Sequence, residues 1–167
     1  ALNGQVNDVG AYTRINIGKS YRKGIELAGG LQLLPGLRLD ANATLSRNRV
    51  AAFTEFVDVY DADFNWLEQQ AIGHEDTDLS FSPGIITGSK LSYQALRNSN
   101  KHELDFSLLT KYVSRQYIDN TSDKANSIDP YSFSDLRIRF VFHPAFAREV
   151  ALTLLAQNIF GAQFETN

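Results

Sequence analysis

A strict two-residue alternation over residues 20–33, SYRKGIELAGGLQL, is the feature that most limits how this chain can fold. Apart from Lys23, the large side chains of one parity are apolar, and the other parity holds only polar or small residues. Successive side chains of a β-strand point to opposite faces, so the segment predicts one long strand with an apolar face and a polar face. The alternation by itself leaves open whether the apolar face fills a soluble core or meets lipid.

Later segments alternate in the same way, over residues 37–48, 83–93, 102–117, 131–143 and 149–158. They predict an all-β chain, folded as an antiparallel up-and-down meander of about six long strands. The best helical candidate is residues 65–71, NWLEQQA, which is too short to carry a domain.

The alternation assigns the side chains of these strands to two faces. The apolar face is expected to carry Tyr21, Ile25, Leu39, Leu104, Phe106, Leu108, Leu136, Ile138, Phe140, Leu152 and Leu154. The opposite, polar face is expected to carry Arg22, Glu26, Arg38, Asp40, Glu103, Asp105, Arg137 and Arg139. Opposite charges on neighbouring strands stabilise a sheet by about 0.2 to 1 kcal/mol each, so we expect cross-strand charge pairs on this face.

Composition excludes several classes of protein. The net charge of -3 argues against a nucleic-acid partner, because such proteins carry basic surfaces. The chain has no cysteine, which removes disulfide frameworks, zinc knuckles and thiol nucleophiles together. No apolar run approaches the roughly 18 residues that a membrane-spanning helix needs, so a chain like this would cross a bilayer with strands.

Strand and connection lengths favour lipid over a soluble core. The predicted strands have about 10 to 15 residues, which exceeds the usual ~5 to 6 and suits a tilted crossing of a bilayer. Short connections alternate with long ones at residues 57–80 and 118–129, as in outer-membrane barrels, whose long loops face outside. Aromatic side chains near both ends of the strands are typical of interfacial girdles. Six strands cannot close such a barrel, and a soluble β-sheet binding module remains the alternative.

Several segments, taken in order, resemble one family. They are NDVGAYTRINIGKSYRKGIEL, LRLDANATLSRNRV, SPGIITGSKLSY, KYVSRQYIDNT and LTLLAQNIFGAQFETN. Their order and spacing resemble the C-terminal part of the barrel of TonB-dependent outer-membrane receptors, in the form common in Bacteroidetes-type bacteria. YRKGIEL resembles the recurrent R-x-G-x-E strand of the family, and QNIF resembles the signature of its penultimate strand.

This resemblance implies that residues 1–167 are the C-terminal portion of a transmembrane barrel of about 22 strands, without its plug domain and final hairpin. The expected location is the bacterial outer membrane. Expected partners are lipid, the rest of the barrel with its plug, and the TonB complex acting through that plug. The expected ligand is a ferric siderophore or similar iron complex, with glycan, haem or cobalamin import as alternatives within the family. No cofactor is expected.

An acidic segment, residues 55–78, holds the candidate ligand-binding residues Asp58, Asp61, Asp63 and Trp66. Clustered carboxylates offer the hard oxygen ligands that Ca²⁺ prefers, but the segment lacks the glycine turn and spacing of an EF-hand loop, so no metal site is expected. A solvated extracellular loop is the favoured interpretation. The aromatic residues Phe53, Phe56, Phe64 and Trp66 are expected to pack this loop down, with stacking on an aromatic or glycan ligand as the alternative.

The sequence carries no pattern of an enzyme. Its three histidines, His74, His102 and His143, do not lie in a nucleophile-elbow context, and no carboxylate pair is marked as a general acid and base. We therefore expect a transport or binding protein rather than an enzyme.

Overall fold

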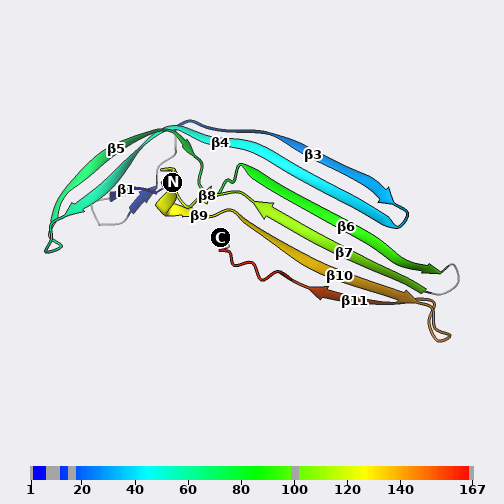
Figure 1. Ribbon diagram of the computed structural model, residues 1–167. Coiled ribbons are helices and arrows are strands. Elements are labelled where there is room, and N and C mark those ends of the chain that lie inside the picture. Colours follow the sequence, from blue (N-terminus) through cyan, green and yellow to red (C-terminus); the bar gives the residue numbers. More distant parts are fainter. Residues whose placement is uncertain (1, 7–11, 15–17, 99–101, 166–167) are drawn as a thin grey trace. The chain divides into compact units, whose positions relative to one another are not determined.

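The computed structural model describes residues 2–6, 12–14, 18–98 and 102–165. The expected all-β, antiparallel meander is confirmed (Figure 1). Its elements are β1 (Leu2–Val6), β2 (Tyr12–Arg14), β3 (Ser20–Leu34), β4 (Leu37–Tyr60), β5 (Trp66–Asp78), β6 (Ile85–Asn98), β7 (His102–Val113), β8 (Gln116–Tyr117), the 3₁₀ helix η1 (Lys124–Asn126), β9 (Ser127–Ile128), β10 (Tyr131–Phe142) and β11 (Val150–Ala156). Among the described residues, no helix is long and apolar enough to cross a membrane.

Seven strands form one sheet. Six of them lie in the order β11-β10-β7-β6-β4-β3, and β5 pairs with β4 outside this order. Five of its neighbouring pairs, β10–β11, β7–β10, β6–β7, β4–β6 and β4–β5, are antiparallel in register, and each of the six predicted strands is present. The β3–β4 hairpin turns at Pro35 and Gly36, where Gly36 has a φ of 80°, a conformation that side chains rarely adopt. The meander therefore follows the turn chemistry and alternation of the sequence.

Strand registers place the predicted apolar residues on one face. One row across the sheet runs through Leu39, Leu91, Leu108, Leu136 and Ala156. The adjacent row on that face runs through Leu37, Tyr93, Phe106, Ile138 and Leu154. Because paired residues of antiparallel strands share a face, the face assignment is confirmed across these strands.

Registers also place the charged residues on the opposite face. A row there runs from Arg38 through Ser92 and Ser107 to Arg137, and a neighbouring row contains Asp105 and Arg139. On β3, a side chain at Gly30 would meet those of Arg38 and Asp40, so the even-numbered positions of β3 share this face. Arg22 and Glu26 are even-numbered positions of the same strand.

Contacts divide the chain into two compact units. The sheet unit comprises residues 24–46, 83–116 and 128–167, and the hairpin unit comprises residues 1–23, 47–82 and 117–127. Strand β4 contributes its first part to the sheet unit and its second part to the hairpin unit.

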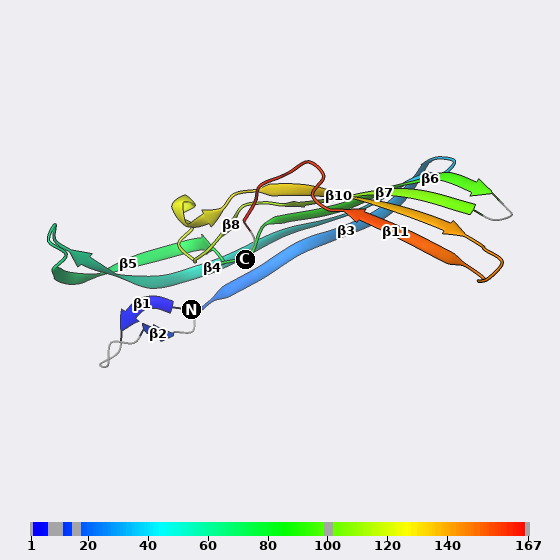
Figure 2. The same ribbon diagram turned by 90° about the horizontal axis from the view of Figure 1, so that it is seen from below.

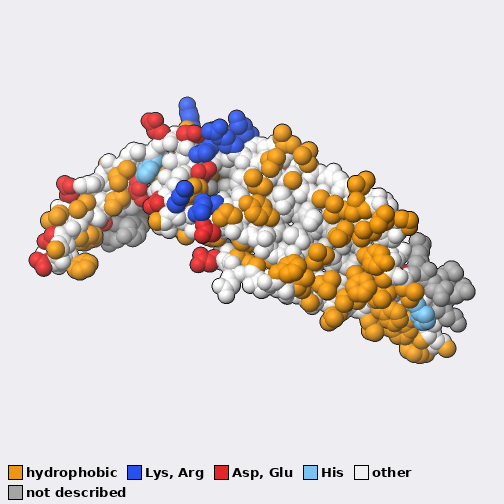
Figure 3. Space-filling view, viewed as in Figure 1, with side chains coloured by type: hydrophobic (Ala, Val, Ile, Leu, Met, Phe, Trp, Pro, Cys, Tyr) orange, Lys and Arg blue, Asp and Glu red, His pale blue; other side chains and the backbone are white. Residues whose placement is uncertain are grey.

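The sheet unit is a single layer (Figure 2). Its apolar face is open: Leu154 keeps 64% of its surface accessible, and Leu152, Leu31 and Ile25 are also exposed. Hydrophobic side chains gather over the sheet strands in the space-filling view (Figure 3). Among the side chains that the structure describes in this unit, the buried apolar ones are Val113, Ile128 and Val141. The predicted apolar residues therefore do not pack into a closed interior.

The expectation of a long loop at residues 57–80 is wrong, because most of these residues lie in the two strands of a hairpin. Strand β4 continues to Tyr60, and β5 begins at Trp66 and returns beside it, with Phe56 paired to Ala71. The helical candidate at residues 65–71 is therefore wrong, because cross-strand pairing overrides a weak local preference.

Residues 118–129, the second predicted long loop, contain η1 and β9 in an ordered arrangement. The amide of Ser80 donates to Asn120 Oδ1 at 2.8 Å, and the amide of Asp78 donates to Ser122 Oγ at 2.6 Å. Val50, which has no accessible surface, lies opposite the buried Thr77 in the same unit. The two hydrogen bonds from the Ser80 and Asp78 amides therefore attach the 118–126 segment to the C-terminal end of β5 and the residues that follow it.

Candidate functional site

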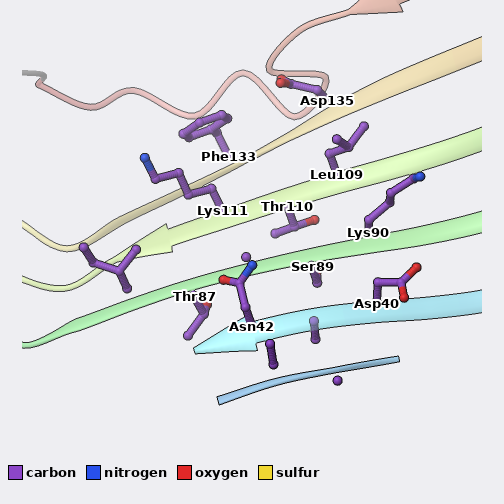
Figure 4. Close-up of a pocket in the computed structure, with 15 residues that line it drawn as sticks. Asp40, Asn42, Thr87, Ser89, Lys90, Leu109, Thr110, Lys111, Phe133 and Asp135 are labelled. Carbon is purple, nitrogen blue, oxygen red and sulfur yellow. The ribbon is translucent and has the colours of Figure 1, made fainter. Parts of the chain in front are cut away.

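A groove of about 850 Å³ lies on the polar face of the sheet unit (Figure 4). Residues of β3, β4, β6, β7 and β10 line it. Its floor is low because Gly88 has no side chain, although Gly88 lies in register between Asn42 and Lys111. A Cβ at Gly88 would lie 3.1 Å from Asn42 Oδ1, so any larger residue there would fill the hollow.

Charged side chains border the groove in a definite order. Lys90 of β6 lies directly opposite Asp40 of β4, and Lys111 of β7 lies opposite Gly88. Asp40 is held by Arg38, whose Nη2 and Nε donate to its Oδ1 at 2.7 and 2.9 Å. This ion pair joins two residues of one strand, so Arg38 does not form the expected cross-strand pair. Asp40 also interacts with the charge of Lys90, its partner across the strands.

Elsewhere on the polar face the expected charge pairs form in part. Arg139 Nη1 lies 4.0 Å from Asp105 Oδ2 across β10 and β7, which is the cross-strand pair predicted from the alternation. Arg22 instead donates to Ser82 Oγ at 3.1 Å, and Arg137 donates to Ser107 Oγ at 3.5 Å. Hydroxyl acceptors thus take the place of carboxylates at these two arginines.

The chain after β11 is fixed against β10. The amide of Asn158 donates to Asp135 Oδ1 at 2.8 Å, and the amide of Ile159 donates to the Ser134 carbonyl at 2.9 Å. Phe164 stacks on Phe133 with ring centroids 5.2 Å apart. Because Phe133 and Asp135 line the groove, this segment also fixes the side chains at one of its walls.

The candidate ligand residues of the acidic segment lie in the hairpin unit. Asp58 and Trp66 come together, since Trp66 Nε1 donates to Asp58 Oδ1 at 3.2 Å. Gln69 Nε2 donates to the same oxygen at 3.0 Å. Asp63 lies at the exposed turn and has no part in this cluster. The structure therefore joins two of the four candidates through one carboxylate.

Asp61 has a structural role in the turn between β4 and β5. Its Oδ1 accepts from the amides of Asp63 and Asn65 at 2.9 and 2.8 Å, and its Oδ2 accepts from Asn65 Nδ2 at 3.0 Å. These bonds, with that from the Asn65 side chain foremost, stabilise the charged form and lower the pKa of Asp61 below its ordinary value. Both oxygens of the Asp61 carboxylate thus accept hydrogen bonds within the turn.

Aromatic residues of this hairpin depart from the expected packing. Phe64 has 87% of its surface exposed and Trp66 has 58%, so neither packs the segment down. Phe53 does pack, because its ring stacks on His74 at a centroid distance of 4.8 Å. His74 Nε2 lies 2.8 Å from Glu55 Oε2, so these two side chains are hydrogen-bonded to each other. In the part of the chain that the structure describes, no three His, Asp or Glu side chains gather as metal ligands would.

The sequence interpretation missed the groove residues Asn42, Gly88, Lys90, Lys111 and Phe133. The sequence did contain one indication of the groove. Gly88 lacks a side chain on the polar face of β6, two residues before Lys90. The neighbour Lys111 becomes visible only from the β6–β7 register.

Comparisons of the chain with protein families, with curated proteins and with solved structures found no match.

Proposed function

We propose that this chain forms part of the wall of a transmembrane β-barrel in the bacterial outer membrane. The uncovered apolar face of the sheet unit carries the proposal. Several of its large side chains, among them Ile25, Leu152 and Leu154, are more than half exposed. Each fully buried side chain of this size is worth about 1.5 to 3 kcal/mol, so water is a poor solvent for the face and hydrocarbon a good one.

The polar face supports the same arrangement. Arg38, Asp40, Asp105, Arg137 and Arg139 all lie on it, opposite the apolar rows, although this face also carries a few apolar side chains such as Leu109 and Phe133. A barrel wall has this distribution, with apolar side chains toward lipid and polar ones toward the lumen. A soluble sandwich or barrel would bury the apolar face instead.

The two edge strands of the sheet require further strands as neighbours. Strands β3 and β11 are the two outermost members of the sheet, each with one neighbour. Open strand edges are not viable in hydrocarbon, because their unpaired backbone groups cannot bond to water. The proposed assembly therefore includes more strands on both sides of this sheet.

We further propose that the barrel is a TonB-dependent receptor that imports a ferric siderophore or similar iron complex. The support is the order and spacing of YRKGIEL, SPGIITGSKLSY and QNIF along the chain, which resemble that family. In this proposal a plug closes the lumen, TonB acts through the plug, and the β4–β5 hairpin with residues 118–129 faces outside.

Single cysteines test the topology, because the chain has no cysteine of its own. In intact cells, an impermeant maleimide should label Asp63→Cys at the β4–β5 turn and leave Phe146→Cys, between β10 and β11, unlabelled. Permeabilised cells should label both, since Phe146 and the turn are exposed. The reverse pattern would contradict the orientation, and recovery of the protein as a soluble monomer would favour a soluble β-sheet binding module.

Ligand capture tests the receptor itself. The receptor carrying Asp58→Asn and Asp63→Asn should show an altered association rate for an ⁵⁵Fe-labelled siderophore complex, with a changed salt dependence, because exposed charges act within about 10 Å. Asp61 is kept, since it holds the turn. The matched control removes two carboxylates elsewhere, through Glu103→Gln and Glu149→Gln. Failure to take up any iron complex would contradict the proposed ligand class.

A further inference from the structure

We propose that the groove on the polar face binds a small anion that carries an apolar or aromatic group, such as an aryl carboxylate. The anionic group would lie over Gly88, between the ammonium groups of Lys90 and Lys111. This inference goes beyond the proposed function and does not depend on it, because the groove lies within the sheet unit whatever the apolar face contacts.

The hollow over Gly88 lies within reach of both lysines. Lys111 is the cross-strand partner of Gly88 on β7, and Lys90 follows two residues later on β6. Paired residues have Cβ atoms about 4.5 to 5.5 Å apart, and alternate residues of a strand are about 6.6 Å apart. Figure 4 shows these two side chains extending in opposite directions, so both would have to rotate to direct their ammonium groups to one point over the glycine.

The two lysines differ in their cross-strand partners: Lys111 lies between Gly88 and Phe133, whereas Lys90 lies opposite Asp40. Among the described residues, no Asp or Glu oxygen lies within 4.0 Å of Lys90 Nζ or Lys111 Nζ. The three hydrogen bonds of Asp40 are with Arg38, and the charge of Lys90 also acts on this carboxylate. Asp135 accepts from the Asn158 amide, and Leu109 separates it from Lys90 in the same row. The charge of Lys111 is therefore available to a ligand, and that of Lys90 is shared with Asp40.

Apolar walls beside the cations select for an anion with a hydrophobic part. Ile86, Leu109 and Phe133 line the groove with the two lysines. Asn42 adds an amide next to the hollow, since it pairs with Gly88. The volume of about 850 Å³ lies within the roughly 300 to 1,000 Å³ of small-molecule sites. An aromatic ring with one carboxylate matches these walls in both size and polarity.

Binding of 4-fluorobenzoate to the detergent-purified protein, followed by ¹⁹F NMR, tests the proposal. We expect saturable binding that weakens as NaCl is raised, and weaker binding of the neutral 4-fluorobenzamide. Lys111→Gln should weaken binding by about two- to fivefold, the effect of one partly exposed charge, and the double variant with Lys90→Gln should weaken it further. Gly88→Val should abolish it by filling the hollow.

Matched controls are Lys124→Gln on η1 and Gly73→Val on β5, where an added Cβ meets open space. Both should bind as the unchanged protein does. Equal binding of the benzoate and the benzamide would overturn the proposal, as would no saturable binding or unchanged affinity in the double lysine variant. Because the lysine variants add no bulk, they remain decisive if Gly88→Val fails to fold.

Discussion

Replacing Leu154 by arginine separates a lipid-facing sheet from a water-facing one. Leu154 is 64% exposed and lies on the apolar face, in the row of Ile138 and Phe106. In water, an exposed substitution of this kind changes the free energy of unfolding by about 0.5 kcal/mol or less. At the midplane of a bilayer, arginine on the lipid face of a barrel costs about 2 to 4 kcal/mol.

The structure places Leu154 near that midplane. Its partner Ile138 lies midway along β10 between Phe142, where the strand ends, and Ser134, where hydroxyl residues enter this face. Ser134 Oγ lies 2.8 Å from Thr110 Oγ1 in that hydroxyl row. The interval from Phe142 to Ser134 is about 27 Å along the strand, or about 20 Å across a bilayer at a tilt near 40°. The full cost of about 2 to 4 kcal/mol is therefore expected.

Leu155→Arg is the matched control, because Leu155 is 51% exposed and faces the other side of the same strand. Its partner is Arg137, so like charges add at most about 1 kcal/mol. The assay is a urea titration of folding into phospholipid vesicles, with the free energy of unfolding compared among the three proteins. Equal, small effects of both substitutions would refute the assignment of the apolar face to lipid.

Three further predictions concern the polar bonds and the hairpin unit. Because hydrogen bonds lower the pKa of Asp61, its contribution to the turn should be complete above about pH 4 and lost as pH falls through the lowered value. Relative to the intrinsic rate, amide exchange at Asn65 should accelerate at that low pH. In Asp61→Asn it should be faster than in the unchanged protein above about pH 4, and an unchanged rate would show that the carboxylate is dispensable. Gly4→Ala should destabilise the packing of β1 by more than about 1 kcal/mol, because Gly4 has a φ of 85° and a Cβ would overlap the Phe56 carbonyl. Hydrogen exchange in β1 measures this loss of stability. The control Gly73→Ala should have a smaller effect, since its Cβ meets open space. Asp105→Asn should cost only about 0 to 1 kcal/mol in a urea titration, since its pair with Arg139 is partly exposed and 4.0 Å long; a cost above 2 kcal/mol would reveal a stronger network.

The faces of the sheet could be read from the sequence because alternation depends only on the geometry of a strand. The alternation alone assigns Leu39, Leu108 and Leu136 to one face, and the registers join them in one row. The same argument placed Asp105 and Arg139 together on the polar face. A periodicity of two needs no knowledge of distant parts of the chain.

The acidic hairpin could not be read in this way. Trp66 and Glu68 lie in β5 because they pair with Tyr60 and Val59, and such pairing is not visible in a short window of sequence. The Arg38–Asp40 bond was missed because neighbours along one strand compete with neighbours across strands. The groove was missed for a related reason: it needs Gly88 and Lys111 side by side, which is a property of register rather than of composition.

The central claim is that the apolar face contacts lipid, and fluorescence quenching by brominated lipid tests it most directly. The chain has one tryptophan, so Trp66→Phe gives a clean background in which a tryptophan is placed at residue 154 or at residue 155. Bromines positioned near the middle of the acyl chains should strongly quench the tryptophan at 154 and spare the one at 155, which faces the polar side. Equal quenching at both positions, or none at 154, would contradict the account.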